Sequence, residues 1–214
     1  MRQTSNTVLL VAKHEDIVGV GADKKMSWGM EKAQNADSKL YQRKDGTVLT
    51  GTGRGSVIQL VGEAFQLPKR KKRQPIREFL LTTVREKLEE FLFKNGGLAV
   101  QGAQLEITHT DILIVYEGEL AEYNIDKEAV EAGLMSLPYT AGCGGAITLG
   151  SFSVLQGGIT DAETLEEAMK VSLRTAGEHS PGCSVENDVI IIHKEKPNGK
   201  NSPKKRNSRR VGKG

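Results

Sequence analysis

The chain has 214 residues, of which 37% are hydrophobic and 27% are charged, and its formal net charge is +3. This composition fits a single globular domain with a hydrophobic core. There is no run of 18 apolar residues, and the first residues lack the apolar stretch of a secretion signal, so we expect no membrane contact. The four His and two Cys show no zinc-ligand spacing, and we expect no metal and no other cofactor.

Positive charge is concentrated in two places. The segment 194–214 holds six Lys, three Arg and one Glu with almost no apolar residue, so we expect a disordered basic tail. A second basic run, KRKKR, occupies 69–73 between two helical patterns. Both runs have the charge to contact nucleic acid or an acidic partner. Neither contains an aromatic residue for base stacking, which disfavours nucleic-acid binding as the main function.

The first third of the chain predicts a strand hairpin, a third strand and a helix. Two β-rich runs are joined by a polar break, as in a hairpin. An Asp-Gly turn signal then leads into a short strand, and a glycine-rich turn leads from this strand into an apolar-periodic stretch. The expected bounds are 7–13 and 17–23 for the hairpin, 47–52 for the third strand and 56–67 for the helix.

The middle of the chain predicts a long helix followed by a second hairpin. Pro75 stands at the first-turn position that proline favours, and apolar residues recur at helical spacing until Asn95 and the two glycines after it. Strand-like runs at 110–116 and 119–125 then flank a Glu-Gly turn.

The last third predicts two helices and a final strand. A tight glycine-rich turn at 141–145 precedes a helix at 146–157, and a second helix at 161–177 begins at a Thr-Asp pair. A last buried strand is expected at 188–193. Strands and helices are thus grouped rather than alternating, which argues for an α+β fold with stacked sheets and outer helices instead of a doubly wound parallel sheet.

Several of these stretches together resemble one protein family. They are VGVGADKKMSWG, KLYQRKDGTVLTGTGRG, TDILIVYEGEL, TAGCGG and DAETLEEAMKVSLRTAGEH leading into NDVIII, and they occur in family order. The family is that of the proteasome β-type peptidases, especially the peptidase subunit of the bacterial two-component ATP-dependent protease. The resemblance implies the fold of the N-terminal nucleophile hydrolases, a four-layer αββα sandwich, over residues 7–193. The basic run and the tail fall outside it.

The resemblance also implies a mechanism. In this family the mature chain begins with a Thr whose hydroxyl attacks the scissile carbonyl, while the free α-amine accepts the proton. An α-amine titrates at about pH 8 and is a usable general base at neutral pH. Here residues 1–6 would be a short propeptide and Thr7 the nucleophile. Ser5 takes the first position instead if the break at 14–16 is longer than in the family, and the two alternatives stay open.

The other residues of the implied site follow from their separation from Thr7. Asp23 and Lys39 lie 16 and 32 positions after it, as the family's acid and lysine do. Lys39 would lower the pKa of the hydroxyl and of the amine, and Asp23 would hold Lys39 in place and balance its charge. The backbone N–H of Gly53 would bind the oxyanion.

Two further positions complete the implied site. Cys143 stands where the family commonly has a Ser, and Glu178 stands near the family's late Asp; both would support the hydroxyl and the amine through hydrogen bonds. Without the resemblance, Thr7 is only a β-branched residue at a strand start, and Asp23 and Lys39 are a surface pair.

The sequence therefore supports two functions of one fold. The first is a threonine-type endopeptidase that works inside a homo-oligomeric ring and hydrolyses unfolded polypeptides. An ATP-dependent unfoldase would deliver these polypeptides to the ring. The alternative is a catalytically inactive structural ring subunit. We expect Cys143 and Cys183 to be free thiols of a cytoplasmic protein rather than a disulfide.

Overall fold

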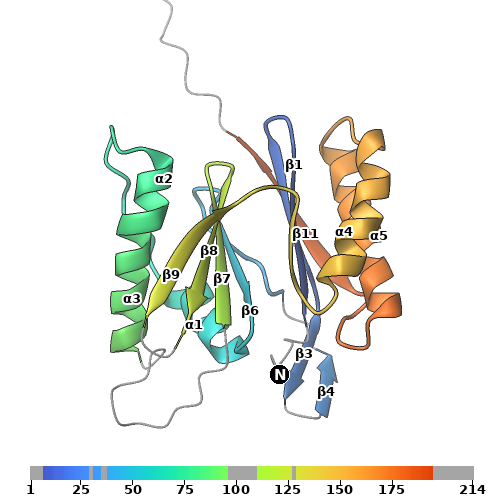
Figure 1. Cartoon of the computed structure of the whole chain (residues 1–214), viewed down its shortest axis with the longest axis horizontal. Helices are drawn as coiled ribbons and strands as arrows, with labels where there is room; N and C mark the ends of the chain where they lie inside the picture. The colour runs from blue at the N-terminus through green and yellow to red at the C-terminus, as the bar shows by residue number, and fades with distance from the viewer. Residues whose placement is uncertain (1–6, 29–30, 35–37, 96–109, 127–128, 195–214) are drawn as a thin grey trace, which may run out of the picture.

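The computed structural model describes residues 7–28, 31–34, 38–95, 110–126 and 129–194. Two antiparallel sheets face each other, and helices cover the outer face of each sheet (Figure 1). The mixed helix-and-sheet class expected from the sequence is confirmed. The segment expected to be a propeptide and the expected basic tail beyond residue 194 lie outside the described residues.

The first sheet contains the N-terminal hairpin and has the strand order β10-β1-β2-β11. All of its neighbouring strands are antiparallel, and Leu9 of the first strand lies opposite Ala22 of the second. The hairpin confirms the prediction. The bounds are β1 Val8–His14, β2 Ile17–Asp23, β10 Tyr139–Gly142 and β11 Asn187–His193.

Two features of this sheet differ from expectation. The residues expected to form a glycine-rich turn are strand as far as Gly142, because β10 pairs with β1, and the turn is confined to Cys143 and Gly144. The strand β11 is half-buried along most of its length rather than buried. It is an edge strand with one neighbour, so one side of its backbone faces away from the sheet.

The second sheet has the strand order β5-β6-β7-β8-β9. The β7–β8 hairpin and the strand β6 confirm the predictions, whereas β9, with the sequence VEAGLM, has no strong strand signal and was not expected. A separate two-stranded ribbon pairs β3 with β4. The bounds are β3 Lys25–Trp28, β4 Glu31–Gln34, β5 Tyr41–Gln42, β6 Val48–Thr52, β7 Thr110–Tyr116, β8 Glu119–Ile125 and β9 Val130–Met135.

Two groups of helices cover the sheets. On the second sheet lie α1 and a long helix that begins after Pro75 and contains one π-helical segment. On the first sheet lie α4, extended by a 3₁₀ turn, and α5, which begins with a capping box at Asp161. All four predicted helices are confirmed. The bounds are α1 Gly55–Ala64, α2 Ile76–Glu78, η1 Phe79–Val84, α3 Arg85–Lys94, α4 Gly145–Leu155, η2 Gln156–Gly158 and α5 Ala162–His179.

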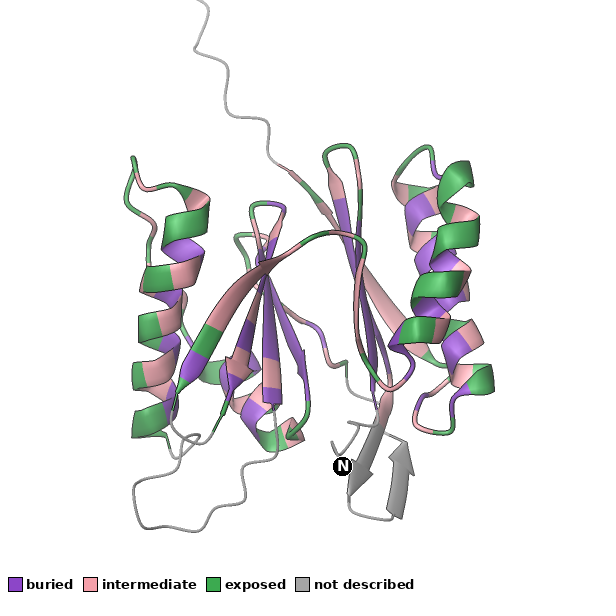
Figure 2. Ribbon diagram, viewed as in Figure 1, coloured by how far each residue is buried: buried purple, intermediate pink, exposed green. Residues whose placement is uncertain are grey.

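Apolar residues fill the space between the two sheets as well as the space under each helical layer. Figure 2 shows buried residues on the strands of both sheets and on the helices beside them. Alternate residues of β1 face opposite ways: Leu9 and Val11 contact the second sheet, whereas Val8 and Leu10 contact the α4–α5 layer. This alternation follows from the period-2 geometry of a strand. Both faces of β1 are therefore buried, which fixes the position of the residue at its start.

One cation of the basic run at 69–73 has a structural partner. Arg70 forms an ion pair of 2.8 Å with Glu117 in the β7–β8 turn and donates a hydrogen bond to the carbonyl oxygen of Gln74. This pair ties the loop between α1 and α2 to the second sheet. No helix in the described ranges is long and apolar enough to cross a membrane.

Candidate active site

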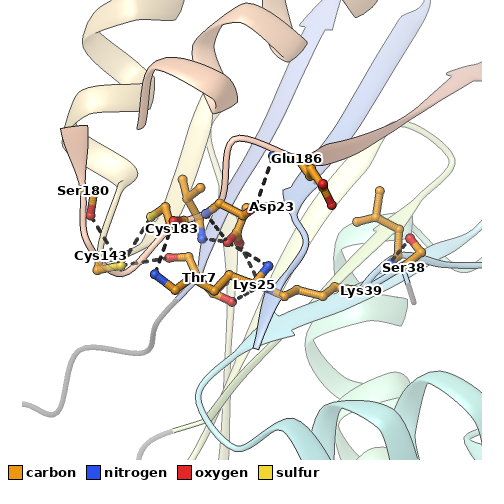
Figure 3. A network of polar contacts seen from close by, with 12 residues as sticks. Thr7, Asp23, Lys25, Ser38, Lys39, Cys143, Ser180, Cys183 and Glu186 are labelled. Atoms are coloured by element: carbon orange, nitrogen blue, oxygen red, sulfur yellow. Dashed lines mark hydrogen bonds and ion pairs between the residues drawn. The ribbon is translucent and has the colours of Figure 1, made fainter. Parts of the chain in front are cut away.

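Three of the predicted residues meet at the start of β1. Asp23 ends β2, which runs antiparallel to β1, so its carboxylate lies beside the first residues of the chain's first strand. Lys39 reaches this point from the loop before β5, and its Nζ lies 2.5 Å from Thr7 Oγ1 and 2.7 Å from Asp23 Oδ1 (Figure 3). The separation of 32 positions thus corresponds to a direct contact between Lys39 and Thr7, whereas Asp23 contacts Lys39 and the N–H of Val8, the residue after Thr7.

The Asp23 carboxylate is held by four donors. It is 1% exposed, and its Oδ1 accepts the N–H of Val8 at 2.9 Å and the Lys39 ammonium. Its Oδ2 accepts the N–H of Ser184 at 3.0 Å and the N–H of Lys25 at 3.2 Å. Burying a carboxylate this deeply is costly unless it is paired and hydrogen-bonded. Its orientation, and with it the position of Lys39, is therefore tightly constrained.

The Lys39 ammonium is itself buried, with 11% of its side chain exposed. Burial lowers the pKa of Lys39 from its ordinary value, and the neighbouring Asp23 opposes this by favouring the charged form. The Lys39 ammonium donates to Thr7 Oγ1, so a positive charge lies against the hydroxyl and favours its deprotonated form. The role of Thr7 as a nucleophile stays a prediction.

Two thiols lie beside the Thr7 backbone. Cys143 Sγ is 3.5 Å from the Thr7 carbonyl oxygen and 3.5 Å from Cys183 Sγ, and the Ser180 hydroxyl donates to it at 3.9 Å (Figure 3). Both cysteines are free thiols, as expected. The hydrogen bond from Cys183 lowers the pKa of Cys143 to about 6, and the same contact raises the pKa of Cys183.

The glycines around Cys143 allow this close packing. Gly142 has a φ of 87°, and a Cβ there would lie 2.0 Å from the Thr7 carbonyl oxygen. A Cβ at Gly144 would lie 2.6 Å from Cys183 Sγ. Only glycine can bring the backbone so near to Thr7 with this dihedral angle.

Gly53 lies in the turn between β6 and α1, with a φ of 103° that L side chains rarely adopt. Hydrogen bonds on both sides fix this turn: the Thr52 hydroxyl donates to Asp111 Oδ2 at 3.1 Å, and the Arg54 N–H donates to Thr110 Oγ1 at 3.1 Å. Gly53 itself is exposed. Its role as an oxyanion donor stays a prediction.

Glu178 is not part of the contact network around Thr7. It is exposed in the last turn of α5, and within the described residues it makes no hydrogen bond to Thr7, Asp23 or Lys39. Ser180, two positions later, is buried instead and contacts Cys143.

Sequence reasoning missed the loop 180–186. It reaches Asp23 through the backbone N–H of Ser184, and it is contacted by the side chain of Lys25 through the carbonyl oxygens of Pro181 and Cys183. Because most of these contacts use backbone groups, side-chain types at these positions carry no signal. In the described part of the chain, no group of three or more His, Cys, Asp or Glu could hold a metal ion.

No family model matches the chain, and no curated protein matches it in sequence. Solved structures are similar to it. BPH of Thiobacillus denitrificans in complex with epoxomicin has a TM-score of 0.64 at 17% identity, over 89% of this chain and 100% of that chain. Eukaryotic HslV from Trypanosoma brucei has a TM-score of 0.56 at 15% identity, over 87% of this chain and 99% of that chain.

A third similar structure is Anbu, an ancestral beta-subunit from Yersinia bercovieri, with a TM-score of 0.59 at 10% identity, over 87% of this chain and 82% of that one. At these identities the likeness establishes the fold alone. It confirms the resemblance on which the sequence analysis relied, and this chain has the fold of the proteasome-type N-terminal nucleophile hydrolases.

Proposed function

We propose that this chain is a threonine-type endopeptidase with Thr7 as its nucleophile. The observation that carries the proposal is the contact of Lys39 Nζ with Thr7 Oγ1 at 2.5 Å and with the buried Asp23 at 2.7 Å. Helices on the outer faces of two facing sheets support the four-layer sandwich of such enzymes. Residues 7–193 form the proposed peptidase domain.

The reaction requires that residues 1–6 be removed first. In the uncleaved chain the nitrogen of Thr7 is part of an amide and cannot act as a base, whereas cleavage before Thr7 frees an α-amine that can. Thr7 Oγ1 then attacks the scissile carbonyl carbon, and the α-amine takes the hydroxyl proton. The Lys39 ammonium stabilises the developing negative charge on Oγ1.

The remaining steps follow acyl-transfer chemistry. The N–H of Gly53 donates to the oxyanion of the tetrahedral intermediate, and the leaving amine receives the proton from the α-amine as the peptide bond breaks. Water, activated by the same α-amine, hydrolyses the ester on Thr7 and regenerates the enzyme. Asp23 keeps Lys39 in place through both halves of the reaction. Cys143 Sγ lies against the Thr7 backbone, 3.5 Å from its carbonyl oxygen.

We propose that the peptidase works as a homo-oligomeric ring in the cytoplasm. A site that depends on the backbone carbonyl of its substrate selects little by side chain, so it needs enclosure to spare folded proteins. Unfolded polypeptide delivered by an ATP-dependent unfoldase is the substrate that fits such an enclosure. The resemblance of the sequence stretches to a two-component ATP-dependent protease supports this part of the proposal.

The test compares the wild type with Thr7→Ala and Ser5→Ala. Intact mass should show loss of residues 1–6 in the wild type, and Thr7→Ala should lose both processing and peptide hydrolysis. Its melting temperature should fall by only a few degrees, because the change removes one hydroxyl and one methyl group while Lys39 keeps its ion pair with Asp23. Epoxomicin, present in the similar BPH structure, should add one inhibitor mass to the wild type and none to Thr7→Ala.

Two results would point elsewhere. Full activity in Thr7→Ala with an inactive Ser5→Ala would assign the nucleophile to Ser5. An assembled wild type that keeps residues 1–6 and hydrolyses no peptide would establish the inactive structural subunit.

A further inference from the structure

The loop 180–186 packs against the Asp23 side of the site. It follows α5 directly, and the N–H of Ser184 in its middle donates to Asp23 Oδ2 at 3.0 Å. Its end is joined to the start of the β3–β4 ribbon by the N–H of Lys24, which donates to the Glu186 carbonyl oxygen at 2.9 Å. Half of the hydrogen bonds that hold the Asp23 carboxylate therefore depend on where this loop and its neighbouring chain lie.

The middle of the loop is held by the Lys25 side chain. Its ammonium donates to the carbonyl oxygen of Pro181 and, at 3.5 Å, to that of Cys183 (Figure 3). Within the described residues, Lys25 forms no ion pair with a carboxylate. Its neighbour Lys24 behaves differently and pairs with Asp188 at 2.9 Å. The Lys25 ammonium is thus directed at two backbone carbonyls of the loop that come just before Ser184.

The loop also has little freedom on its other side. A Cβ at Gly177, in the last turns of α5, would lie 2.3 Å from the Ser184 carbonyl oxygen, so the loop folds back closely onto the helix end. The hydrogen bonds from the Lys25 ammonium to the loop carbonyls of Pro181 and Cys183 are charge-assisted, and such bonds are stronger than neutral ones.

We infer that Lys25 is a positioning residue for Asp23, acting at two points. Its own backbone N–H donates to Asp23 Oδ2 at 3.2 Å, and its ammonium fastens the loop that presents the Ser184 N–H to the same oxygen. The inference rests on the proposed function, because Asp23 matters there for holding Lys39 against Thr7.

Loss of the ammonium has a defined consequence. The loop carbonyls lose their donor, the loop moves away from Asp23, and Oδ2 keeps only the N–H of residue 25. The carboxylate can then rotate, and Lys39 no longer stays within hydrogen-bond distance of Thr7 Oγ1. Since Lys25 acts on the partner of the nucleophile and not on the substrate, kcat falls while KM is unchanged.

The experiment compares three variants of the full chain. Lys25→Met keeps the side-chain length and removes all hydrogen-bond donors. Lys25→Arg keeps a cation with N–H donors, and Lys25→Gln keeps one neutral amide donor group. Lys24→Met is the matched control, since it removes a neighbouring ammonium with a surface carboxylate partner. Two quantities are measured: amide hydrogen exchange over residues 180–186, and kcat and KM for a peptide substrate.

We expect Lys25→Met to exchange about tenfold to hundredfold faster than wild type over the loop, the range set by losing charge-assisted hydrogen bonds. Its kcat should fall by a similar factor with KM within about twofold. Lys25→Arg should restore most of the wild-type exchange protection and kcat, and Lys25→Gln should lie between Lys25→Met and Lys25→Arg in both quantities. Lys24→Met should match the wild type in exchange rate and in kcat.

Exchange in Lys25→Met equal to that of the wild type would overturn the inference, and so would faster exchange with an unchanged kcat. A drop in kcat for Lys24→Met as large as for Lys25→Met would also overturn it. The exchange measurement needs no turnover. If the wild type proves inactive, the proposed function fails, and the exchange data still decide whether Lys25 holds the loop.

Discussion

Replacing Asp23 by Asn removes one negative charge from the centre of the site without changing the size of the side chain. The carboxylate is 1% exposed, with Val8 N–H and Lys39 on one oxygen and the N–H groups of Ser184 and Lys25 on the other. An amide has one acceptor oxygen, so either orientation leaves two donors facing an NH2 group. We expect the variant to fold, to be less stable, and to lose peptide hydrolysis.

The size of the loss in stability follows from these contacts. A buried N–H left without an acceptor costs about 1–3 kcal/mol, and breaking a buried ion pair costs about 3–5 kcal/mol. Because the two costs overlap at one side chain, we expect a total of about 3–5 kcal/mol. In a protein of this size 1 kcal/mol shifts the melting temperature by about 2–4 °C, so the expected loss is about 6–20 °C.

The destabilisation depends on pH through Lys39. Burial lowers the pKa of Lys39 below its ordinary value of 10.5 while Asp23 opposes the shift, so removing the carboxylate lowers this pKa further. Between the pKa of Lys39 in the folded variant and its higher pKa in the unfolded chain, the unfolded chain binds more protons than the folded chain. The stability of the variant therefore rises with pH across that window. The difference from wild type is therefore largest at low pH and shrinks as the pH approaches the folded pKa of wild-type Lys39.

The assay is urea unfolding of wild type and Asp23→Asn from pH 6 to pH 9, with Asp188→Asn as the control. Asp188 pairs with Lys24 at 2.9 Å near the surface, with 27% of the Lys24 and 30% of the Asp188 side chain exposed, so its loss should change the free energy of unfolding much less than the loss of Asp23 does. A variant as stable as the wild type, or a destabilisation that grows as pH rises, would refute the reasoning.

Three other substitutions test the surroundings of Thr7. The alkylation rate of Cys143 should reach half its maximum at about pH 6, measured by mass after the reaction is stopped. Cys183→Ala should move that midpoint to higher pH, because Cys183 is the main cause of the lowered pKa of Cys143. Gly142→Ala should lower both the melting temperature and hydrolysis, because its Cβ would lie 2.0 Å from the Thr7 carbonyl oxygen, whereas Gly150→Ala, with no atom within 4 Å, should not destabilise the chain. Glu178→Ala should change kcat by less than about twofold, as expected for an exposed side chain; a tenfold loss would return Glu178 to the site.

The parts of the fold that local patterns determine were predictable. The β1–β2 hairpin places its first and last residues side by side once two runs of equal length pair in antiparallel register, so the proximity of Asp23 to Thr7 follows from the sequence. The strands β9 and β10 were missed because their pairing partners, not their own composition, make them strands. VEAGLM contains a glycine and little alternation, and it is strand because β8 lies beside it along its whole length.

The location of Lys39 needed the family resemblance, because nothing in its own surroundings points toward Thr7. The donors on Asp23 Oδ2 could not be predicted from any pattern, since two backbone N–H groups supply them and one of these comes from a position 161 residues away. A backbone group carries no residue-specific signal. Only the tertiary fold decides which N–H reaches a buried carboxylate.

The exposure of Glu178, in contrast, could have been predicted from the sequence alone. The buried face of α5 recurs at steps of three and four: Leu165, Ala168, Met169, Ser172, Leu173 and Ala176. Continuing that stripe by four residues from Ala176 leads to Ser180, whereas Glu178 is two residues from Ala176 and therefore about 200° around a helix of 3.6 residues per turn. The structure agrees, with Ser180 buried against Cys143 and Glu178 exposed. Helical phase thus favours the Ser180 hydroxyl, directly after α5, over the Glu178 carboxylate as the group that reaches Cys143, although the carboxylate matches the family's residue type more closely.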